Sequence, residues 1–150
     1  MKICFLTHDL NIKDGGGRLA FDFVLNLRKS GQEVSILTDW DLFKNPLFNF
    51  LKIRKIFKNS DIIHVIDIWP KGFYARLISL GLRKPIIITA LGTYSVLPFY
   101  SWRRPLMFWA VRGARVIAIS DYTKKKINKI LSHLDMRVIC PGFDLDFWSQ

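Results

Sequence analysis

Three consecutive glycines, Gly15 to Gly17, are followed by Arg18 and stand between a predicted strand and a predicted helix. The first turn of a helix has N–H groups without intrahelical partners, and the helix dipole makes that end positive, so this junction favours an anion such as phosphate. Residues without a Cβ let the backbone approach the anion closely. The run matches neither G-x-G-x-x-G nor a Walker loop. A turn that binds nothing is therefore the alternative to a phosphate-binding loop.

Apolar patterning on both sides defines the elements that hold this loop. Ile3 to Thr7 is a continuous apolar run, which is typical of a strand covered on both faces. After the glycines, apolar residues recur at helical spacing from Leu19 to Leu27, and Gly31 is suited to end that helix. The glycines are thus expected where the carboxyl end of a strand meets the amino end of a helix.

The rest of the chain alternates in the same way. Further strands are predicted at Val34–Thr38, Asp61–Asp67, Pro85–Ala90, Arg115–Ile119 and Arg137–Cys140. Helical patterns cover Leu42–Lys58, Lys71–Leu82 and Ser101–Gly113, and Ser120 is a predicted N-cap for a helix that runs to about Leu134. This alternation predicts one α/β domain with a Rossmann-like, doubly wound, mostly parallel sheet of about six strands flanked by helices.

In such a sheet, ligands bind outside the carboxyl ends of the strands, near the point where the strand order reverses. Residues separated in the sequence are therefore expected on one rim. They are Gly15 to Arg18, Asp67 to Lys71, Leu91 to Tyr94 with Gly92 and Thr93 between them, and Ser120 to Asp121. His8, His64 and Asp67 are candidate pocket residues. For His64, between Ile63 and Val65, a hydrogen-bonded core histidine is the default interpretation.

The formal net charge of +11 indicates an anionic partner, whether phosphate groups, an acidic membrane surface or nucleic acid. Two segments, Leu42 to Lys58 and Trp102 to Arg115, combine cations with bulky apolar groups. For the first segment, a helix whose apolar side packs on the sheet is the favoured interpretation. The alternative is a helix that inserts into an anionic membrane surface. The membrane-facing candidates are Lys52, Arg54, Lys55, Trp102, Arg103 and Arg104.

Cys4 and Cys140 each fall inside a predicted strand and are expected as small buried hydrophobes rather than as a disulfide. This usage fits a reducing cytosol. The N-terminus reaches charged residues too soon for a signal peptide. The uncharged stretch from Pro85 to Trp102 is interrupted by Gly92 and Pro98, so a buried strand followed by a loop is expected there rather than a membrane span. The expected location is cytoplasmic, with a peripheral position on the inner face of the membrane.

Five segments, taken together in order and spacing, resemble the N-terminal domain of the GT-B-fold, retaining glycosyltransferases of family 4. They are GGGRLAFDFVLNLRKSGQEVSILT, DIIHVIDIWPKG, KPIIITALGTYS, ARVIAISDYTKKKI and PGFDLDFW. The resemblance implies an N-terminal half that holds the acceptor, a C-terminal half that holds a nucleotide-diphosphate sugar, and catalysis between the two. No metal or other cofactor is implied.

The resemblance also implies roles for individual residues. Gly15 to Gly17 correspond to the loop that approaches the donor diphosphate or an acceptor phosphate, and Arg18 to a cation on the same rim, with an i,i+4 pair to Asp22 as its alternative role. Gly92 and Thr93 match the second glycine turn of the family, and Ser120 matches the serine after the fifth strand. Family members often have histidines at the positions of Leu91 and Ile66, and their replacement here implies a different acceptor or impaired activity.

The paired glutamates and the donor-binding basic pair of the family have no counterpart in these 150 residues. We expect residues 1–140 to form the acceptor-side domain and residues 141–150 to begin the hinge to a donor-binding half, so that this chain alone does not transfer sugar. The acceptor is expected to be anionic, lipid-linked or otherwise. The alternative is a non-catalytic module that docks onto a partner carrying the donor site. Nucleic acid is not an expected partner, because no reading motif accompanies the charge.

Overall fold

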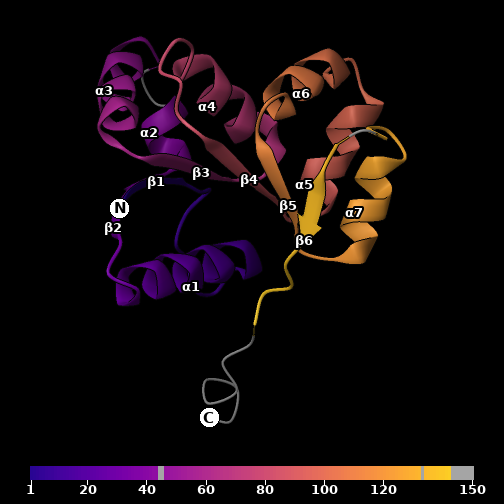
Figure 1. Ribbon diagram of the computed structural model, residues 1–150, viewed down its shortest axis with the longest axis horizontal. Coiled ribbons are helices and arrows are strands. Elements are labelled where there is room, and N and C mark those ends of the chain that lie inside the picture. Colours follow the sequence, from indigo (N-terminus) through magenta and orange to yellow (C-terminus); the bar gives the residue numbers. More distant parts are fainter. Residues whose placement is uncertain (44–45, 133, 143–150) are drawn as a thin grey trace.

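A computed structural model describes residues 1–43, 46–132 and 134–142. Within these residues, six strands form one parallel sheet in the order β2-β1-β3-β4-β5-β6 (Figure 1). The strands are β1 Lys2–Leu6, β2 Glu33–Leu37, β3 Ile62–Ile66, β4 Ile86–Ala90, β5 Arg115–Ala118 and β6 Met136–Val138. The predicted α/β, doubly wound architecture is confirmed.

Helices connect successive strands. They are α1 Gly15–Lys29, α2 Asp39–Phe43, α3 Pro46–Asn59, α4 Phe73–Ile78, α5 Thr93–Val96, α6 Arg104–Val111 and α7 Asp121–Asn128. A π-helical turn, η1 Ile68–Gly72, leads into α4, and a 3-10 turn, η2 Leu97–Tyr100, follows α5. Among the described residues, none of the helices combines the length and apolarity needed to cross a bilayer.

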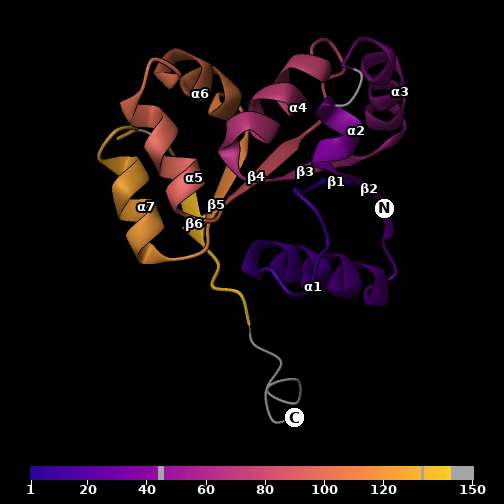
Figure 2. The same ribbon diagram turned by 180° about the vertical axis from the view of Figure 1, so that it is seen from behind.

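The two faces of the sheet are covered unequally. The helix α1 packs Ala20 and Val24 against Phe5 of β1 and Ile66 of β3. On the opposite face, buried residues of α3, α4, α6 and α7 join one larger core, and Figures 1 and 2 show α3, α4 and α6 on the side of the sheet away from α1. Strand order reverses between β1 and β3, because β2 lies on one side of β1 and all later strands lie on the other.

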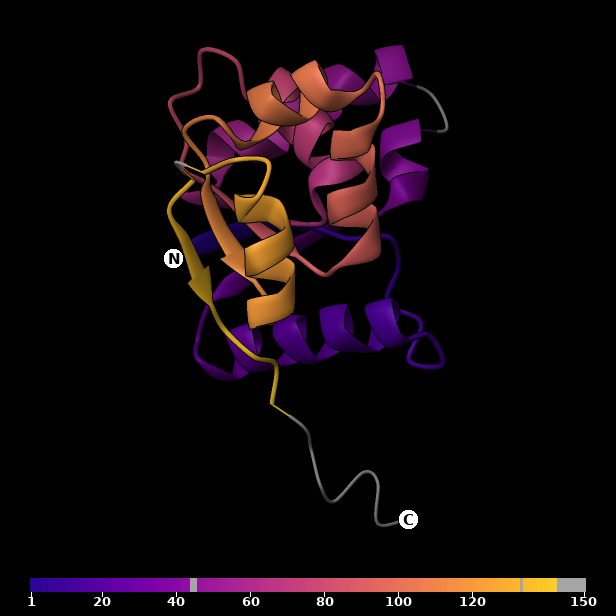
Figure 3. The same ribbon diagram turned by 90° about the vertical axis from the view of Figure 1, so that its right-hand side faces the viewer.

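Both ends of α1 are capped, and the cap at Gly31 was predicted. The Asp14 carboxylate accepts a hydrogen bond from the Gly17 backbone N–H at 3.1 Å, which caps the helix start. After Ser30, Gly31 has a φ of +75° and donates its N–H to the Arg28 carbonyl at 2.9 Å. The side view in Figure 3 shows α1 as a separate layer below the sheet. The amino end of α1 and the carboxyl end of β1 meet at one cavity, which Gly16 and Thr7 both line.

Several predicted boundaries were wrong. One helix was expected from Leu42 to Lys58. The structure has two there: α2, which begins at Asp39, before the expected start, and α3, which begins at Pro46. The expected loop after β4 contains α5 and η2. The last strand ends at Val138, so Cys140 lies outside it and is exposed, whereas Cys4 is buried in β1 as expected. Most of the predicted hinge, residues 143–150, lies outside the described part of the chain.

Candidate functional site

A cavity of about 1090 Å³ opens at the carboxyl ends of β1, β3 and β4, beside the point where strand order reverses. The rule for parallel sheets predicts a ligand site at this position. The lining residues come from four separate segments: Thr7, His8 and Asp9; Asp14 and Gly16; Ile66, Asp67, Trp69, Pro70 and Lys71; and Leu91, Gly92, Leu97, Pro98, Ser101 and Arg103. Three of the four predicted rim segments thus contribute to one cavity.

Asp67 ends β3 in an unusual backbone conformation. Its φ is +70°, in a region that non-glycine residues rarely adopt, and its side chain is buried. One carboxylate oxygen, Oδ1, accepts hydrogen bonds from the Ser95 hydroxyl at 2.8 Å and from the Leu91 N–H at 3.4 Å. The carboxylate therefore ties the end of β3 to the segment that follows β4, on the wall of the cavity.

His8, Asp39 and Lys71 form a charged cluster across three neighbouring strand ends. His8 Nδ1 lies 2.5 Å from Asp39 Oδ2, and Lys71 Nζ lies 3.7 Å from Asp39 Oδ1. Lys71 is 5% exposed, which is unusual for a lysine. His8 and Lys71 both line the cavity. A buried cation is thus held beside the cavity by an aspartate that is itself oriented by an exposed histidine.

Arg103 brings a second cation to the same wall. Its guanidinium carbon lies 5.6 Å from the centroid of the Trp69 ring and 5.3 Å from that of Trp102. Its Nε is buried and has no hydrogen-bond partner in the described part of the protein. Contact with aromatic faces favours a guanidinium and keeps the side chain extended across the rings. Arg103 therefore lies in the cavity wall, and its membrane-facing role stays a prediction.

The glycine loop has three distinct environments. Gly15 is exposed, Gly16 lines the cavity, and Gly17 is buried. A Cβ on Gly17 would lie 2.8 Å from the Asn11 nitrogen and 2.5 Å from Asp9 Oδ1, so the third glycine is required for packing. Its N–H is bonded to Asp14. Of the three glycines, Gly16 lines the cavity, together with Asp14.

Besides Gly15 and Gly17, the predicted site residues Arg18, Ser120 and His64 lie outside the set that lines the cavity. Arg18 Nε donates to both carboxylate oxygens of Asp22, at 3.0 and 3.1 Å, as its alternative role predicted. Ser120 Oγ accepts the Thr123 N–H at 3.2 Å and caps α7. The third residue is His64.

His64 lies in β3 and is buried in the core, as the default interpretation predicted. Its Nε2 lies 2.8 Å from Thr89 Oγ1, and its ring meets Phe5 and Phe23 edge to face, with centroids 5.0 and 5.7 Å apart. Burial lowers the pKa of His64 from 6.5 to about 4, because the charged imidazolium would lose its hydration. His64 is therefore neutral near pH 7 and does not reach the cavity.

Gly92 lines the cavity with a φ of +149°, and α5 begins at the next residue. The side chains of Thr93 and Tyr94, two predicted site residues, lie outside the described part of the chain. In that part, no group of three or more histidine, cysteine, aspartate or glutamate side chains is arranged to hold a metal ion. The charged and hydrogen-bonding side chains among the lining residues are those of Thr7, His8, Asp9, Asp14, Asp67, Lys71, Ser101 and Arg103.

The family model for Glycosyltransferase Family 4 matches residues 40–147. The chain belongs to glycosyltransferase family 4. A search of curated proteins found no significant match.

Solved structures agree with the family 4 assignment at the level of fold. Alr3699/HepE from Anabaena, in complex with UDP, superposes with a TM-score of 0.69 and 19% identity, over 99% of this chain and 46% of that one. An alpha-glucosyltransferase in complex with UDP and a DNA 13-mer gives a TM-score of 0.69 and 13% identity, over 97% and 43%. This chain spans less than half the length of these structures and has the fold of the N-terminal domain of a GT-B glycosyltransferase.

Two departures from the family 4 pattern fall in the cavity wall. Leu91 and Ile66, which replace histidines that are common in the family, both line the cavity. Ile66 is buried and also packs against α1, so it contributes to the core as well. The wall is therefore more apolar at the ends of β3 and β4 than the family pattern implies.

The remaining membrane-facing candidates divide into two groups. Lys52, Lys55, Trp102 and Arg104 are exposed, with Trp102 at 76%. Arg54, in contrast, is half-buried and donates its Nη1 to the Ile78 carbonyl at 2.6 Å, at the carboxyl end of α4. This contact satisfies a carbonyl at the end of a helix, so Arg54 also connects α3 to α4, and its membrane-facing role stays a prediction.

For several cavity residues the sequence predicted at most a place on the rim and no individual role. Lys71 lay in a segment predicted for the rim, but its burial and its pairing with Asp39 gave no sequence signal. Trp69 and Ser101 were not singled out either. A run of Asp, Ile, Trp, Pro and Lys directly after a buried strand was the available indication, because residues at this place in parallel sheets often contact ligands.

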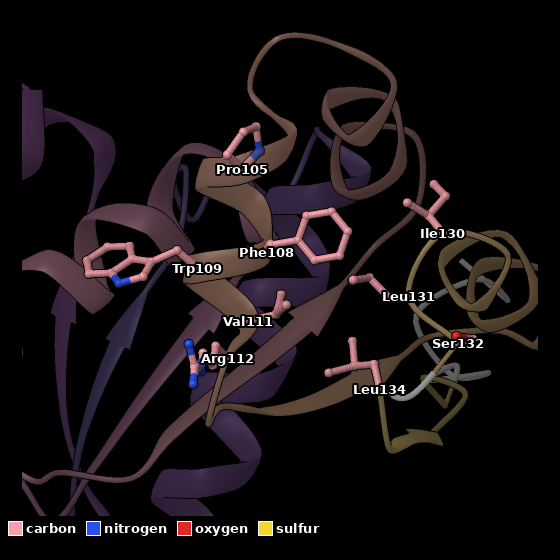
Figure 4. Close-up of a pocket in the computed structure, with 9 residues that line it drawn as sticks. All are labelled: Pro105, Phe108, Trp109, Val111, Arg112, Ile130, Leu131, Ser132 and Leu134. Carbon is pink, nitrogen blue, oxygen red and sulfur yellow. The ribbon is translucent and has the colours of Figure 1, made fainter.

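A second hollow, of about 580 Å³, lies between α6 and the segment after α7. Figure 4 shows Phe108 of α6 directed toward Leu131, with Leu134 below. Its other lining residues are Pro105, Trp109, Val111, Arg112, Ile130 and Ser132. Most of these side chains are apolar, and the charged or hydroxyl side chains among the described lining residues are those of Arg112 and Ser132.

Proposed function

We propose that this chain is the acceptor-side domain of a retaining, metal-independent glycosyltransferase. In this proposal the enzyme transfers a sugar from a nucleotide-diphosphate sugar to an anionic acceptor. Membership of family 4 supports the transferase class, and the UDP complexes of HepE and the alpha-glucosyltransferase suggest a nucleotide-sugar donor. The donor would bind a second half, so the 150-residue chain alone is expected to be inactive.

One observation supports this proposal above the others: the cavity at the strand ends joins the glycine loop to the segments after β3 and β4. The acceptor would lie in this cavity and present its nucleophile toward the donor half. Amides of Gly15 and Gly16 would face negative oxygen atoms at the same rim, where hydrogen bonds from fixed dipoles stabilise charge on a leaving group.

The test is transfer by a complete enzyme. This chain would be fused to, or mixed with, the donor-binding half of a family 4 enzyme and supplied with a panel of nucleotide sugars and anionic acceptors. We expect release of the nucleoside diphosphate and a glycosylated product, with no product from either half alone. Absence of product with every donor and acceptor, from a fusion shown to be folded, would contradict the assignment.

A lipid-linked acceptor would place the protein at a membrane surface. The exposed cations Lys52, Lys55 and Arg104 and the exposed Trp102 are suited to an anionic interface. Each cation near an anionic surface contributes about 1 kcal/mol. We expect cosedimentation with anionic vesicles and not with neutral ones, weakened by Lys52→Gln with Lys55→Gln. Equal and negligible sedimentation with both would leave only a dissolved anionic acceptor.

A non-catalytic interaction module is the alternative, and exposed apolar residues near the cavity favour it. Leu97 is 59% exposed, Tyr100 is 65% exposed, and Trp102 is 76% exposed. Grouped exposed apolar side chains of this kind are typical of protein-binding surfaces. The module predicts a stable complex with a partner that carries the donor site, and substitution of Tyr100 and Trp102 by serine would disrupt that complex. A monomeric protein from which no partner copurifies would contradict it.

A further inference from the structure

Three carboxylates line the cavity wall, and each of them accepts a hydrogen bond from a neighbouring loop residue. Asp67 Oδ1 accepts from Ser95 and Leu91. Asp14 accepts the Gly17 N–H, and Asp9 Oδ1 accepts the Asn11 N–H at 3.1 Å. One oxygen of each of these carboxylates thus makes a contact that holds a loop in place.

The cations on the wall are less completely engaged. Lys71 Nζ is 3.7 Å from Asp39 Oδ1, which is longer than a hydrogen bond, and Asp39 is also paired with His8. Arg103 Nε is buried without an acceptor in the described residues, and the aromatic rings beside Arg103 supply none. A buried donor without a partner is costly, and the cost is larger for a charged group. Both side chains therefore favour an incoming anion.

The two cations are connected through one short segment. Trp69, whose ring lies beside the Arg103 guanidinium, is two residues before Lys71 in the turn that follows β3. Tight burial of Lys71 fixes the first cation, and stacking fixes the second. Cations held in this way lose little side-chain entropy when they bind an anion, so affinity and specificity both benefit.

We propose that Lys71 and Arg103 bind a phosphate group of the acceptor in this cavity. The inference rests on the proposed function, because it treats the cavity as the acceptor site, and it adds the chemical class of the acceptor and the residues that recognise it. Arg offers a planar pair of donors that matches two phosphate oxygens, and Lys adds a compact charge. The phosphate belongs either to a dissolved sugar phosphate or to a lipid headgroup.

The experiment is a titration of the 150-residue chain with inorganic phosphate, followed by calorimetry or by amide chemical shifts. We expect saturable binding at millimolar phosphate or below. Lys71→Met and Arg103→Gln, which keep most of the side-chain volume, should each weaken binding about tenfold or more, as expected for loss of a charged hydrogen bond. The matched controls are Lys52→Met and Arg104→Gln, both at exposed positions, which should bind phosphate like the natural chain.

If Lys71→Met fails to fold, Arg103→Gln against Arg104→Gln carries the same comparison between adjacent residues. Equal phosphate binding by the folded cavity variants and the controls would overturn the proposal, as would absence of binding by the natural chain. Competition by a hexose phosphate identifies a dissolved acceptor, and competition by phosphatidic acid vesicles but not neutral ones identifies a lipid phosphate. If neither competes with inorganic phosphate, the acceptor assignment is overturned.

The fused enzyme separates this inference from the proposed function. Transfer to an uncharged acceptor at a rate that Lys71→Met leaves unchanged would overturn the phosphate site and keep the transferase. Phosphate binding that depends on Lys71 and Arg103, with no transfer from any donor, would keep the site and overturn the transferase.

Discussion

His64 of β3 and Thr89 of β4 share a buried hydrogen bond of 2.8 Å between the imidazole Nε2 and the hydroxyl Oγ1. The two residues lie on the sheet face that α1 covers, since His64 also contacts Phe5 and Phe23. A polar pair inside a parallel sheet is tolerated when both partners are satisfied. The pair requires a neutral imidazole, because burial lowers the pKa of His64 to about 4 and no carboxylate of the described residues is bonded to its ring.

This pairing predicts a pH dependence of stability. In the unfolded chain a histidine binds its proton near pH 6.5, whereas the folded pKa is about 4, so between these values the unfolded state binds more protons. The free energy of unfolding therefore falls as the pH is lowered from 7 through this window, by roughly 2 kcal/mol at pH 5 from His64 alone. Urea unfolding of the natural chain and of His64→Gln at both pH values measures the difference.

His64→Gln lowers stability at pH 7 but removes this part of the pH dependence, so the two proteins should converge as the pH falls to 5. His8→Asn is the control. His8 is exposed and lies beside Asp39, so its substitution should leave the pH dependence that comes from the buried His64 in place. Parallel pH profiles for the natural chain and His64→Gln would show that the imidazole carries no such linkage.

Gly17 should not tolerate a side chain. A Cβ there would lie within 3.0 Å of backbone atoms of Asn11, which cannot move away as a flexible side chain can. We expect Gly17→Ala to lower the free energy of unfolding by about 1–3 kcal/mol, the usual cost of overpacking. Gly15→Ala is the matched control in the same turn, since a Cβ there meets nothing within 4 Å. It should be neutral or slightly stabilising, and an equal loss in both variants would contradict the packing argument.

The bond from Ser95 to Asp67 should stabilise the cavity wall. Ser95 is fully buried, and its hydroxyl donates to Asp67 Oδ1 at 2.8 Å. Ser95→Ala leaves a buried carboxylate oxygen with only the longer bond from Leu91, which costs about 1–3 kcal/mol. Ser79→Ala is the control, because that buried hydroxyl contacts only a carbonyl of its own helix, that of Arg76. Chemical denaturation of both variants compares the two costs, and equal small losses would contradict the prediction.

The fold could be predicted because the parallel strands are mostly short apolar runs. Such a run can be identified from the local sequence without knowing which strands lie beside it. The same reasoning located the rim, since carboxyl ends of parallel strands lie together, and it identified His64 as a core residue. Element boundaries failed where the pattern was weak. The segment from Thr93 to Tyr100 has no charged face, so its helical turns left no amphipathic signal.

The arrangement of the cavity could not be predicted from sequence, because its contacts join distant residues. Asp39 and Lys71 are separated by 32 positions and meet only because β2 and β3 flank β1. Arg103 beside Trp102 has the composition of an exposed membrane-binding segment. Its inward placement depends on Trp69, which comes from a different connection. Local patterns describe an element, whereas these pairs depend on how the elements pack.

Asp14 should weaken the binding of anions while it stabilises the fold. Its carboxylate caps α1 and lines the cavity, so it repels a phosphate that binds in the cavity. Asn caps a helix about as well as Asp. Asp14→Asn should therefore raise the affinity for inorganic phosphate by about twofold to fivefold at low salt, as expected for one charge near the surface. It should lower the free energy of unfolding by no more than about 1 kcal/mol, from the lost interaction with the helix dipole.

Asp14→Ala separates the two roles, because it removes both the charge and the cap. Its phosphate affinity should rise as in Asp14→Asn, whereas its stability should fall by a further amount of about 1 kcal/mol. Calorimetric titration at low and at high salt measures the first effect, and the gain should shrink as ions screen the carboxylate. An unchanged phosphate affinity in both variants would place the bound anion away from the amino end of α1, and hence away from the glycines.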